Sequence, residues 1–444
     1  MTKIVIIGAG SGFGSRLSVD IMSRDALQDA TIALCDIHPG RLRQVTDYVK
    51  RTAEKYGLST KVISSPDRRD LLLGADFVIT SVAVGGGAYW GEPYKSEIEI
   101  PLKYGINQSV ADTVGVGGIF RFLRTGPVQH QFLLDMEDLC PDAYVLNHTN
   151  PMAMLTWLHS VDSTVRNVGL CHSVQGTTQK LACIAGVPYE ETSCLVAGIN
   201  HQAWVLEMNA GKEDLYPRIW QALNEDPEVY AGDTVRFEMM KQFGYFVTES
   251  TRHNSEYLPY FRQTPELMER FGLERRDVGT VPRRVREWEA DGAAGGEASV
   301  GELRCSQEYT TGIIEAMLTN VPFRFNGNVM NTGLITNLPD GCCVEVPCMV
   351  DANGVNPCYV GALPAQLAAL NVSSVAVEEL AVQAVLEKDR EAAFWACAVD
   401  PLTSAVLPLH RIREMFDELW EASQQHLRWF DPDFTGPLPE ICAL

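Results

Sequence analysis

The chain has 444 residues, of which 46% are apolar, so it can bury large cores and is long enough for two or three domains. Its formal net charge of -21 would repel nucleic acid and anionic membrane surfaces, which argues against both as partners and favours a small-molecule ligand. The apolar run in MTKIVIIGAG is too short for a signal peptide or a membrane span, so we expect a cytoplasmic protein. We expect its twelve cysteines to be free thiols.

A strand, a glycine-rich loop and a helix follow one another at the start of the chain. Residues 4–7 form an apolar run that predicts a buried strand, and apolar residues recur at helical spacing beyond the loop. The loop glycines are Gly8, Gly10, Gly12 and Gly14. This order suits a phosphate cradle, in which Gly8 permits a tight turn and Gly10 lets the backbone approach a pyrophosphate at the helix N-terminus. The dinucleotide fingerprint expects its third glycine where Phe13 stands, so the pattern is imperfect.

A carboxylate ends the second predicted strand. Residues 31–34 form this strand, and Asp36 follows it. Asp36 is placed to accept hydrogen bonds from a ribose diol, which favours NAD over a 2'-phosphorylated cofactor. The alternative is that Asp36 only caps the next helix. Residues 75–87 then predict a fourth parallel strand that enters a glycine-rich loop at the carboxyl edge of a doubly wound sheet.

Two polar residues lie in loops near this edge. Asp112 lies in the glycine-bounded loop 103–118, before a helix that we expect to begin at Ile119. Asn150 follows the predicted fifth strand in AYVLNHTNP and would face the nicotinamide. Each also has a simpler interpretation, because Asp before glycine and Asn before proline are ordinary turn signals.

A thiol and two imidazoles occur where apolar segments give way to loops. Cys171 and His172 follow the segment 165–170, and His201 follows Asn200 between two further apolar segments. Thiolate and imidazole are ligands of borderline transition metals, so we expect Cys171 and His201 to share one ion beside a bound dinucleotide. Their spacing matches no zinc motif, and a lone cysteine after a strand is often a small buried hydrophobe.

The second half of the chain has a different pattern. Ionisable and aromatic residues between Glu249 and Tyr257, including Arg252 and His253, suit a substrate pocket, although a solvated helix face is the alternative. The acidic, glycine-rich stretch 284–302 predicts a mobile loop, 328–357 an antiparallel sheet, and 375–427 mostly helix.

These elements predict an α/β fold with two domains. Residues 1–200 would form an N-terminal Rossmann-type doubly wound parallel sheet that binds NAD. Residues 201–444 would form a C-terminal α+β domain for substrate, metal and oligomerisation.

Seven strings together resemble glycoside hydrolase family four, and especially its α-galactosidase branch, over nearly the whole chain. They are GAGS at 8–11, ADTVGVGG at 111–118, NPMAM at 150–154, GLCHSVQGT at 169–177, AGINH at 197–201, GYFVTES at 244–250 and NLPDGCCVEVPCMVDANG at 337–354. The resemblance implies a fold related to lactate and malate dehydrogenases, bound NAD and a divalent ion, usually Mn²⁺, and a homodimer or homotetramer.

The resemblance also implies a mechanism without net redox change. NAD oxidises the sugar at C3, a base removes the C2 proton, and the aglycone leaves by elimination. Water then adds, and NADH returns the hydride to C3.

Residue roles follow from the matching strings. Cys171 and His201 would bind the metal, Asn150 would contact sugar and nicotinamide, and Asp112 would be the acid for the leaving oxygen. Tyr257 would be the base, because Thr251 stands where some non-phospho relatives have Asp. The remaining residues expected at the cofactor are Gly8, Gly10, Ser11, Gly12, Phe13 and Asp36, and those expected at the substrate are His172, Arg252 and His253.

The substrate class follows from one replacement. Phospho-sugar branches carry an Arg near the place of Tyr94, so an uncharged glycoside is expected, above all an α-galactoside. An α-glucoside, α-glucuronide or α-galacturonide stays open as a substrate. Two further alternatives are a simple NAD-dependent sugar dehydrogenase and a non-catalytic NAD-binding regulator.

Overall fold

The N-terminal half forms a parallel sheet in the order of dinucleotide-binding folds. The structure is a computed structural model and describes residues 1–85, 91–276, 278, 300–434, 436 and 438. The parallel strands are β1 (Lys3–Ile7), β2 (Thr31–Cys35), β3 (Lys61–Ser65), β4 (Phe77–Thr80), β5 (Tyr144–Asn147) and β6 (Arg166–Gly169). They lie side by side as β3-β2-β1-β4-β5-β6, and each neighbouring pair is parallel. This order confirms the predicted Rossmann-type sheet.

Helices cover both faces of this sheet, which explains why β1 is apolar from Ile4 to Ile7. Ile4 and Ile6 belong to the core formed with α1 (Gly12–Met22) and α2 (Pro39–Tyr56). Val5 and Ile7 face the opposite core, formed with α3 (Arg69–Leu72) and α5 (Gly115–Leu139). A strand that is buried on both faces needs an apolar residue at every position, as in doubly wound folds.

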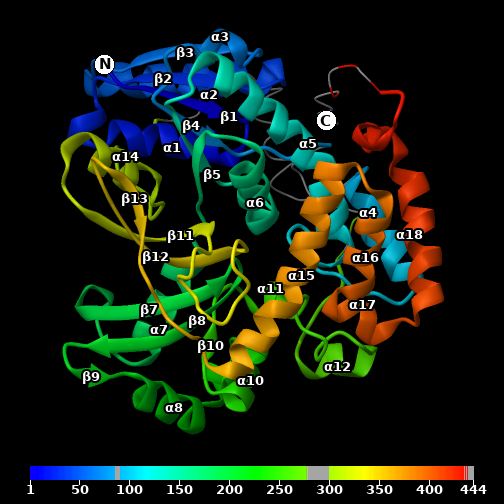
Figure 1. Cartoon of the computed structure of the whole chain (residues 1–444). Helices are drawn as coiled ribbons and strands as arrows, with labels where there is room; N and C mark the ends of the chain where they lie inside the picture. The colour runs from blue at the N-terminus through cyan, green and yellow to red at the C-terminus, as the bar shows by residue number, and fades with distance from the viewer. Residues whose placement is uncertain (86–90, 277, 279–299, 435, 437, 439–444) are drawn as a thin grey trace.

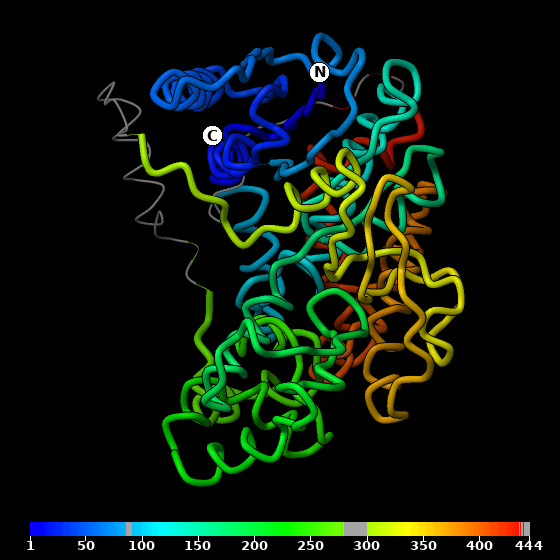
Figure 2. The backbone as a smooth tube through the Cα atoms, turned by 90° about the vertical axis from the view of Figure 1, so that its left-hand side faces the viewer, coloured from blue at the N-terminus to red at the C-terminus, as the bar shows by residue number. Residues whose placement is uncertain are grey.

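Antiparallel strands extend the same sheet beyond β6. They are β7 (Thr192–Ile199), β8 (Gln202–Ala210), β10 (Phe246–Val247), β11 (Phe323–Met330) and β12 (Cys343–Asp351), with β9 (Glu213–Asp214) and β13 (Gly354–Pro357) at their margins. The antiparallel sheet predicted for 328–357 is confirmed. Figure 2 shows the segment from β7 to α12 (Pro265–Arg270) below the N-terminal sheet. The division at residue 200 stays a prediction, because one continuous sheet joins both parts.

A group of C-terminal helices packs beside the central helices α5 and α6 (Met152–Asp162) (Figure 1). The group comprises α15 (Ala365–Glu387), α16 (Arg390–Val399), α17 (Pro401–Val406) and α18 (Leu409–Ser423), as the predicted helical tail requires. By length and composition α15 alone among the described helices could cross a membrane, but half of its apolar window is buried, as in the core helix of a folded domain.

The remaining helices connect these layers. They are α4 (Tyr94–Lys103), α7 (Ser173–Ile184), α8 (Tyr216–Glu225), α9 (Pro227–Ala231), α10 (Thr234–Phe243), α11 (Thr251–Asn254) and α14 (Thr310–Thr319). The eleven cysteines in the described part of the chain form no disulfide, as predicted.

The predicted start of α5 at Ile119 is wrong. The helix begins at Gly115, because the preceding loop folds back onto its first turn. A Cβ on Gly117 would lie 2.7 Å from the Ala111 Cβ, and one on Gly118 would lie 2.5 Å from the Thr113 carbonyl carbon. These glycines are therefore needed for close packing inside the helix. The predicted mobile loop at 284–302 falls mostly outside the described residues.

Candidate functional site

A cavity of about 790 Å³ opens at the carboxyl ends of the parallel strands. Residues that follow β1, β2, β4, β5 and β6 all contribute to its wall, as expected for a ligand site in this fold. The predicted site residues that line it are Gly8, Gly10, Ser11, Gly12, Phe13, Asp36, Asp112, Asn150, Cys171, His172, His201 and His253. The structure thus joins in one cavity residues that lie as far apart in the sequence as Gly8 and His253.

The glycine loop has the shape of a phosphate cradle. Gly8 has φ +86°, and a Cβ there would lie 2.1 Å from the Ser81 carbonyl oxygen, so only glycine fits without a shift. A Cβ on Gly10 would lie 2.6 Å from Asp36 Oδ2. The loop leads into the N-terminus of α1 at the cavity wall, where backbone N–H groups favour an anion.

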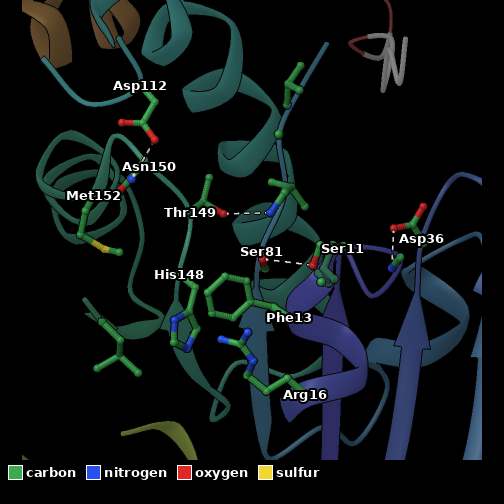
Figure 3. Close-up of a pocket in the computed structure, with 18 of the residues that line it drawn as sticks. Ser11, Phe13, Arg16, Asp36, Ser81, Asp112, His148, Thr149, Asn150 and Met152 are labelled. Atoms are coloured by element: carbon green, nitrogen blue, oxygen red, sulfur yellow. Dashed lines mark hydrogen bonds between the residues drawn. The ribbon is translucent and has the colours of Figure 1, made fainter. Parts of the chain in front are cut away.

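Asp36 lies at the end of β2 and faces this loop (Figure 3). Its Oδ2 accepts a hydrogen bond from the Gly10 amide at 2.8 Å, and its Oδ1 accepts one from the His38 amide at 2.8 Å. The carboxylate is therefore fixed at the cavity wall by two backbone amides. The helix cap of α2 is provided by His38, whose Nδ1 accepts from the Arg41 amide, so Asp36 does not have that role.

Hydrogen bonds tie the ends of β4 and β5 to the loop and to Asp112 (Figure 3). The Ser11 and Ser81 hydroxyls lie 3.3 Å apart, and Thr149 Oγ1 accepts from the Val82 amide at 3.0 Å. Asn150 Nδ2 donates to Asp112 Oδ2 at 3.2 Å. Arg121 Nε donates to the Asn150 carbonyl at 3.2 Å. Asn150 is thereby held on both its backbone and its side chain.

Three potential metal ligands meet at the wall of the same cavity. One ligand atom from each of Cys171, His201 and Glu249 lies within 4.8 Å of the other two, and all three residues line the cavity. A thiol, an imidazole and a carboxylate form a donor set that suits a borderline divalent ion. The two predicted ligands are thus brought together, and the structure adds Glu249.

Local backbone structure places each of the three. Cys171 follows the carboxyl end of β6, two residues before the start of α7, and its sulfur accepts from the Ser173 amide at 3.4 Å. His201 lies in the two-residue turn between β7 and β8, with φ +63°. Glu249 has φ +72° and follows β10, which pairs with β8 and so brings Glu249 beside the turn. Two non-glycine residues in this strained region at one site indicate a functional constraint.

The orientation of His201 is set by a second histidine. His201 Nδ1 and His253 Nε2 lie 3.0 Å apart, whereas His201 Nε2 lies 3.7 Å from Glu249 Oε2. If Nε2 binds a metal ion, Nδ1 keeps the proton and donates it to His253, as metal-bound histidines commonly do toward a neighbouring acceptor. His253 therefore orients the predicted ligand in addition to lining the cavity.

Burial and charge act on the two acidic ligands in opposite ways. Burial raises the pKa of Cys171 well above its usual range, and Glu345 and Glu249 raise it further. Burial would also raise the pKa of Glu249, but His201 and His253 outweigh it and lower that pKa. A bound cation would favour the thiolate, because it compensates the buried negative charge.

Asp112 is held as a carboxylate. Burial opposes its ionisation, but electrostatic interactions with His253 and Arg121 outweigh burial and lower its pKa to about 2. Thr113 Oγ1 donates to its Oδ1 at 2.8 Å, and His253 Nε2 lies 3.7 Å from the same oxygen. The carboxylate can accept a proton at neutral pH.

Three predicted residues lie at the margin of the site or behind it. Tyr257 is 1% exposed and does not line the cavity, and its ring centroid lies 5.9 Å from that of His253. Burial raises its pKa well above the usual value, and Glu378 adds to this.

Arg252 also lies outside the cavity lining, where its Nε donates to Ser109 Oγ at 3.1 Å. His172 is exposed at the cavity mouth, with Nδ1 3.9 Å from Glu308 Oε1.

The sequence predicted Glu249 in a substrate pocket rather than among the metal ligands, and it indicated no role for Arg121. Arg121 lies within α5 in both the predicted and the observed helix, but its contact with the Asn150 carbonyl joins two distant segments of the chain. Glu249 reaches the metal ligands only through the pairing of β10 with β8, which is a contact between distant segments. A non-glycine residue with positive φ has no reliable sequence signal.

Comparison with known proteins gives consistent matches over the whole chain. A model described as family 4 glycosyl hydrolase matches residues 3–187, and one for the family 4 glycosyl hydrolase C-terminal domain matches residues 196–403. An alpha-galactosidase from Bacillus subtilis is 42% identical, with 95% of this chain and 98% of that protein covered. An alpha-galactosidase from Rhizobium meliloti is 35% identical, with 96% and 89% covered. More distant relatives include an alpha-galacturonidase from Thermoanaerobacterium saccharolyticum at 28% identity.

Solved structures share the fold. A 6-phospho-alpha-glucosidase from gut microorganisms, in complex with NAD and Mn²⁺, has a TM-score of 0.79 and 22% identity, with 96% of this chain and 98% of that chain covered. A malate dehydrogenase from Plasmodium falciparum has a TM-score of 0.51 and 14% identity, with 89% and 100% covered. The expected likeness to dehydrogenases is confirmed at the level of the fold.

Proposed function

Because the chain belongs to family 4 of the glycosyl hydrolases, we propose that it hydrolyses α-galactosides with NAD and a divalent metal ion, Mn²⁺ above all, as cofactors. The two related alpha-galactosidases support the choice of sugar, and the NAD and Mn²⁺ complex of the related 6-phospho-alpha-glucosidase supports the cofactors. The single observation that carries the proposal is that Cys171, His201 and Glu249 meet in the cavity that also contains the glycine loop.

The cavity has room and polar partners for a dinucleotide. Gly8 and Gly10 let the loop pack closely against Ser81 and Asp36, and the N-terminus of α1 that follows suits a pyrophosphate. Ser11, Gly12 and Phe13 would complete this contact. Asp36 would bind the adenosine ribose, and Asn150, fixed by Asp112 and Arg121, would face the nicotinamide end.

The cofactors would supply the chemistry that the side chains lack. When bound, NAD would accept a hydride from the sugar C3 and return it later, while the cation would polarise the sugar oxygens so that C2 can lose a proton and the aglycone can leave. The protein side chains would hold this arrangement. Cys171, His201 and Glu249 would bind the cation and leave positions open for the sugar oxygens.

Asp112 would handle a proton at the sugar. It is ionised in the free protein, so it would first accept a proton, which the sugar C3 hydroxyl would release when the hydride leaves C3. It could then act as the predicted acid toward the leaving oxygen only after this uptake, which is the usual alternation of a single acid–base group. Asn150 Nδ2 would keep the carboxylate directed at the substrate.

Tyr257 is our candidate for the base that removes the C2 proton. Its hydroxyl is buried and makes no hydrogen bond within the described part of the chain. A phenol needs a lowered pKa for this task, and a cation held by the neighbouring His201 would supply it. We assign His172, Arg252 and His253 to the substrate side, His253 through its contacts with His201 and Asp112.

We further propose an uncharged sugar. Tyr94, at the place of the phospho-sugar Arg, uses its hydroxyl to donate to the Val110 carbonyl at 3.0 Å, which supports the Asp112 loop. The alternatives are an α-glucoside, an α-glucuronide and, as in the related alpha-galacturonidase, an α-galacturonide. A cytoplasmic homodimer or homotetramer completes the proposal.

The test is cofactor removal followed by a substrate panel. Protein stripped of metal by chelation and of NAD by charcoal should lose hydrolysis of 4-nitrophenyl α-galactoside. Mn²⁺ and NAD together, with a reductant that protects Cys171, should restore it. Activity that survives removal of both would contradict the proposal. Net accumulation of NADH would support a dehydrogenase instead. The same assay with β-galactosides, α-glucosides, uronides and 6-phosphates would identify the sugar.

A further inference from the structure

A buried carboxylate that does not line the cavity holds the loop before Asp112. Glu256 is 2% exposed, and its two oxygens accept hydrogen bonds from three successive backbone amides. The Ser109 amide donates to Oε1, the Val110 amide lies 3.1 Å from Oε1 and 3.2 Å from Oε2, and the Ala111 amide lies 3.4 Å from Oε2. The next residue in the chain is Asp112. The carboxylate thus acts on the backbone that carries the proposed proton acceptor.

The conformation of this loop requires such support. Residues 106–111 form no helix or strand, and Ala111 has φ +50°, which a residue with a side chain adopts only when its surroundings enforce it. Successive amides that converge on one anion form the enforcing arrangement. Without the carboxylate, three buried N–H groups would lose their acceptor.

The same segment holds the loop at two neighbouring points. Arg252 Nε donates to Ser109 Oγ at 3.1 Å, and Arg262 Nη1 donates to the Asn107 carbonyl at 3.3 Å. Arg262 Nε also donates to Ser255 Oγ at 2.6 Å, which fixes the residue before Glu256. This segment also carries His253 and so joins the Asp112 loop to the residues around the metal ligands.

We propose that Glu256 is a positioning residue: its carboxylate clamps the amides of residues 109–111 and so directs the Asp112 side chain toward Asn150 and His253. The inference rests on the proposed function, in which Asp112 handles a proton at the sugar. Glu256 itself does not line the cavity. Its carboxylate therefore acts on catalysis through the loop that carries Asp112.

Hydrogen–deuterium exchange tests the clamp without any need for activity. In Glu256→Gln, one carboxylate oxygen becomes an NH₂ group that cannot accept, so the peptide covering residues 107–112 should exchange at least tenfold faster than in the wild type. Glu137→Gln is the matched control, because Glu137 accepts from the Thr164 amide and from Ser163 Oγ away from the cavity. Unchanged exchange at 107–112 in the Glu256 variant would overturn the proposal.

A double-mutant cycle tests the link to Asp112. With methyl α-galactoside, whose leaving oxygen must be protonated, and with NAD and Mn²⁺, Glu256→Gln should lower kcat at least tenfold and leave the Kd values for NAD and Mn²⁺ within about twofold. In an Asp112→Asn background the same change should cost less than twofold, because the residue on which it acts is already disabled. Equal losses of kcat in both backgrounds would show that Glu256 has a merely structural role. This result would overturn the inference about Glu256 and leave the proposed function unaffected. Full activity of Asp112→Asn would overturn both this inference and the proposed role of Asp112. If Glu256→Gln does not fold, Glu256→Asp, whose shorter side chain cannot reach all three amides, replaces it in both tests.

Discussion

The glycine loop provides the sharpest test of how the dinucleotide site is built. Gly14 lies in the first turn of α1, and a Cβ there would lie 1.9 Å from the Ala9 carbonyl oxygen and 2.6 Å from its carbon. Ordinary contact begins at 3.4 Å, so Gly14→Ala requires the helix and the loop to separate by about 1.5 Å. Gly12 lies in the same turn, and a Cβ there would meet nothing within 4 Å. Both substitutions add one methyl group, but only the methyl group on Gly14 clashes with the loop. Gly12 lines the cavity, so Gly12→Ala is the control for stability.

The surroundings of Gly14 and Gly12 determine how much each substitution changes stability and NAD affinity. Forcing one extra carbon into a packed site costs about 1–3 kcal/mol, whereas Ala in place of Gly inside a helix gains about 1 kcal/mol. A displaced loop would also lose one of its charge-assisted hydrogen bonds to the pyrophosphate, which costs about 1.5–3 kcal/mol. Gly14→Ala should therefore bind NAD about 10- to 100-fold more weakly than wild type.

The assay is NAD titration by calorimetry, together with thermal unfolding of protein stripped of NAD. Gly12→Ala should unfold at the wild-type temperature or slightly above it, and Gly14→Ala should unfold below it. If Gly14→Ala keeps both wild-type NAD affinity and wild-type unfolding temperature, the account of the cradle is refuted.

Three further predictions concern the metal, the ribose and a buried acid. Cys171→Ser should weaken Mn²⁺ binding at least tenfold, measured from the electron paramagnetic resonance signal of unbound Mn²⁺. The control Cys183→Ser, which alters an exposed thiol of α7, should leave Mn²⁺ affinity unchanged. Equal Mn²⁺ affinities of Cys171→Ser and wild type would exclude the thiolate as a ligand. Asp36→Ala should weaken NAD binding by about tenfold or more, because charge-assisted hydrogen bonds to the ribose are lost, and unchanged NAD titration would contradict this role. Burial raises the pKa of Glu378 from its usual 4.5 to about 8, so its ionisation destabilises the fold progressively as pH rises from 4.5 to 8, by on the order of 5 kcal/mol at pH 9. Glu378→Gln should therefore raise the unfolding temperature at pH 9 and much less at pH 5, and an equal shift at both pH values would contradict the sign.

Local sequence patterns were sufficient to predict the parallel sheet, because each of its strands and loops is a contiguous stretch of the chain. The apolar strands, the glycine loop and Asp36 each follow directly in sequence, and the strand order then agrees with the dinucleotide-binding fold. The fingerprint appeared imperfect at Phe13, but Gly14 provides the close contact with Ala9 that a third glycine is expected to allow.

Long-range pairing limited what could be predicted of the site. Cys171 and His201 were predicted as partners from their residue types and from the family resemblance. Glu249 joins them through β10, and Glu256 reaches the Asp112 loop across 145 residues of chain, as its bond from the Ala111 amide shows. Neither contact has a spacing that a sequence pattern can reveal. The start of α5 was misplaced because glycines that usually mark a loop here allow close packing inside a helix.

The central claim is that this chain opens a glycosidic bond by transiently oxidising the sugar beside a cation held by Cys171, His201 and Glu249. Isotope uptake tests it most directly. Hydrolysis of 4-nitrophenyl α-galactoside in D₂O, followed by NMR of the released sugar, should show deuterium bonded to C2, because the C2 proton is removed and replaced from solvent in each turnover. Released sugar that keeps only hydrogen at C2 would show direct displacement at the anomeric carbon and contradict the account.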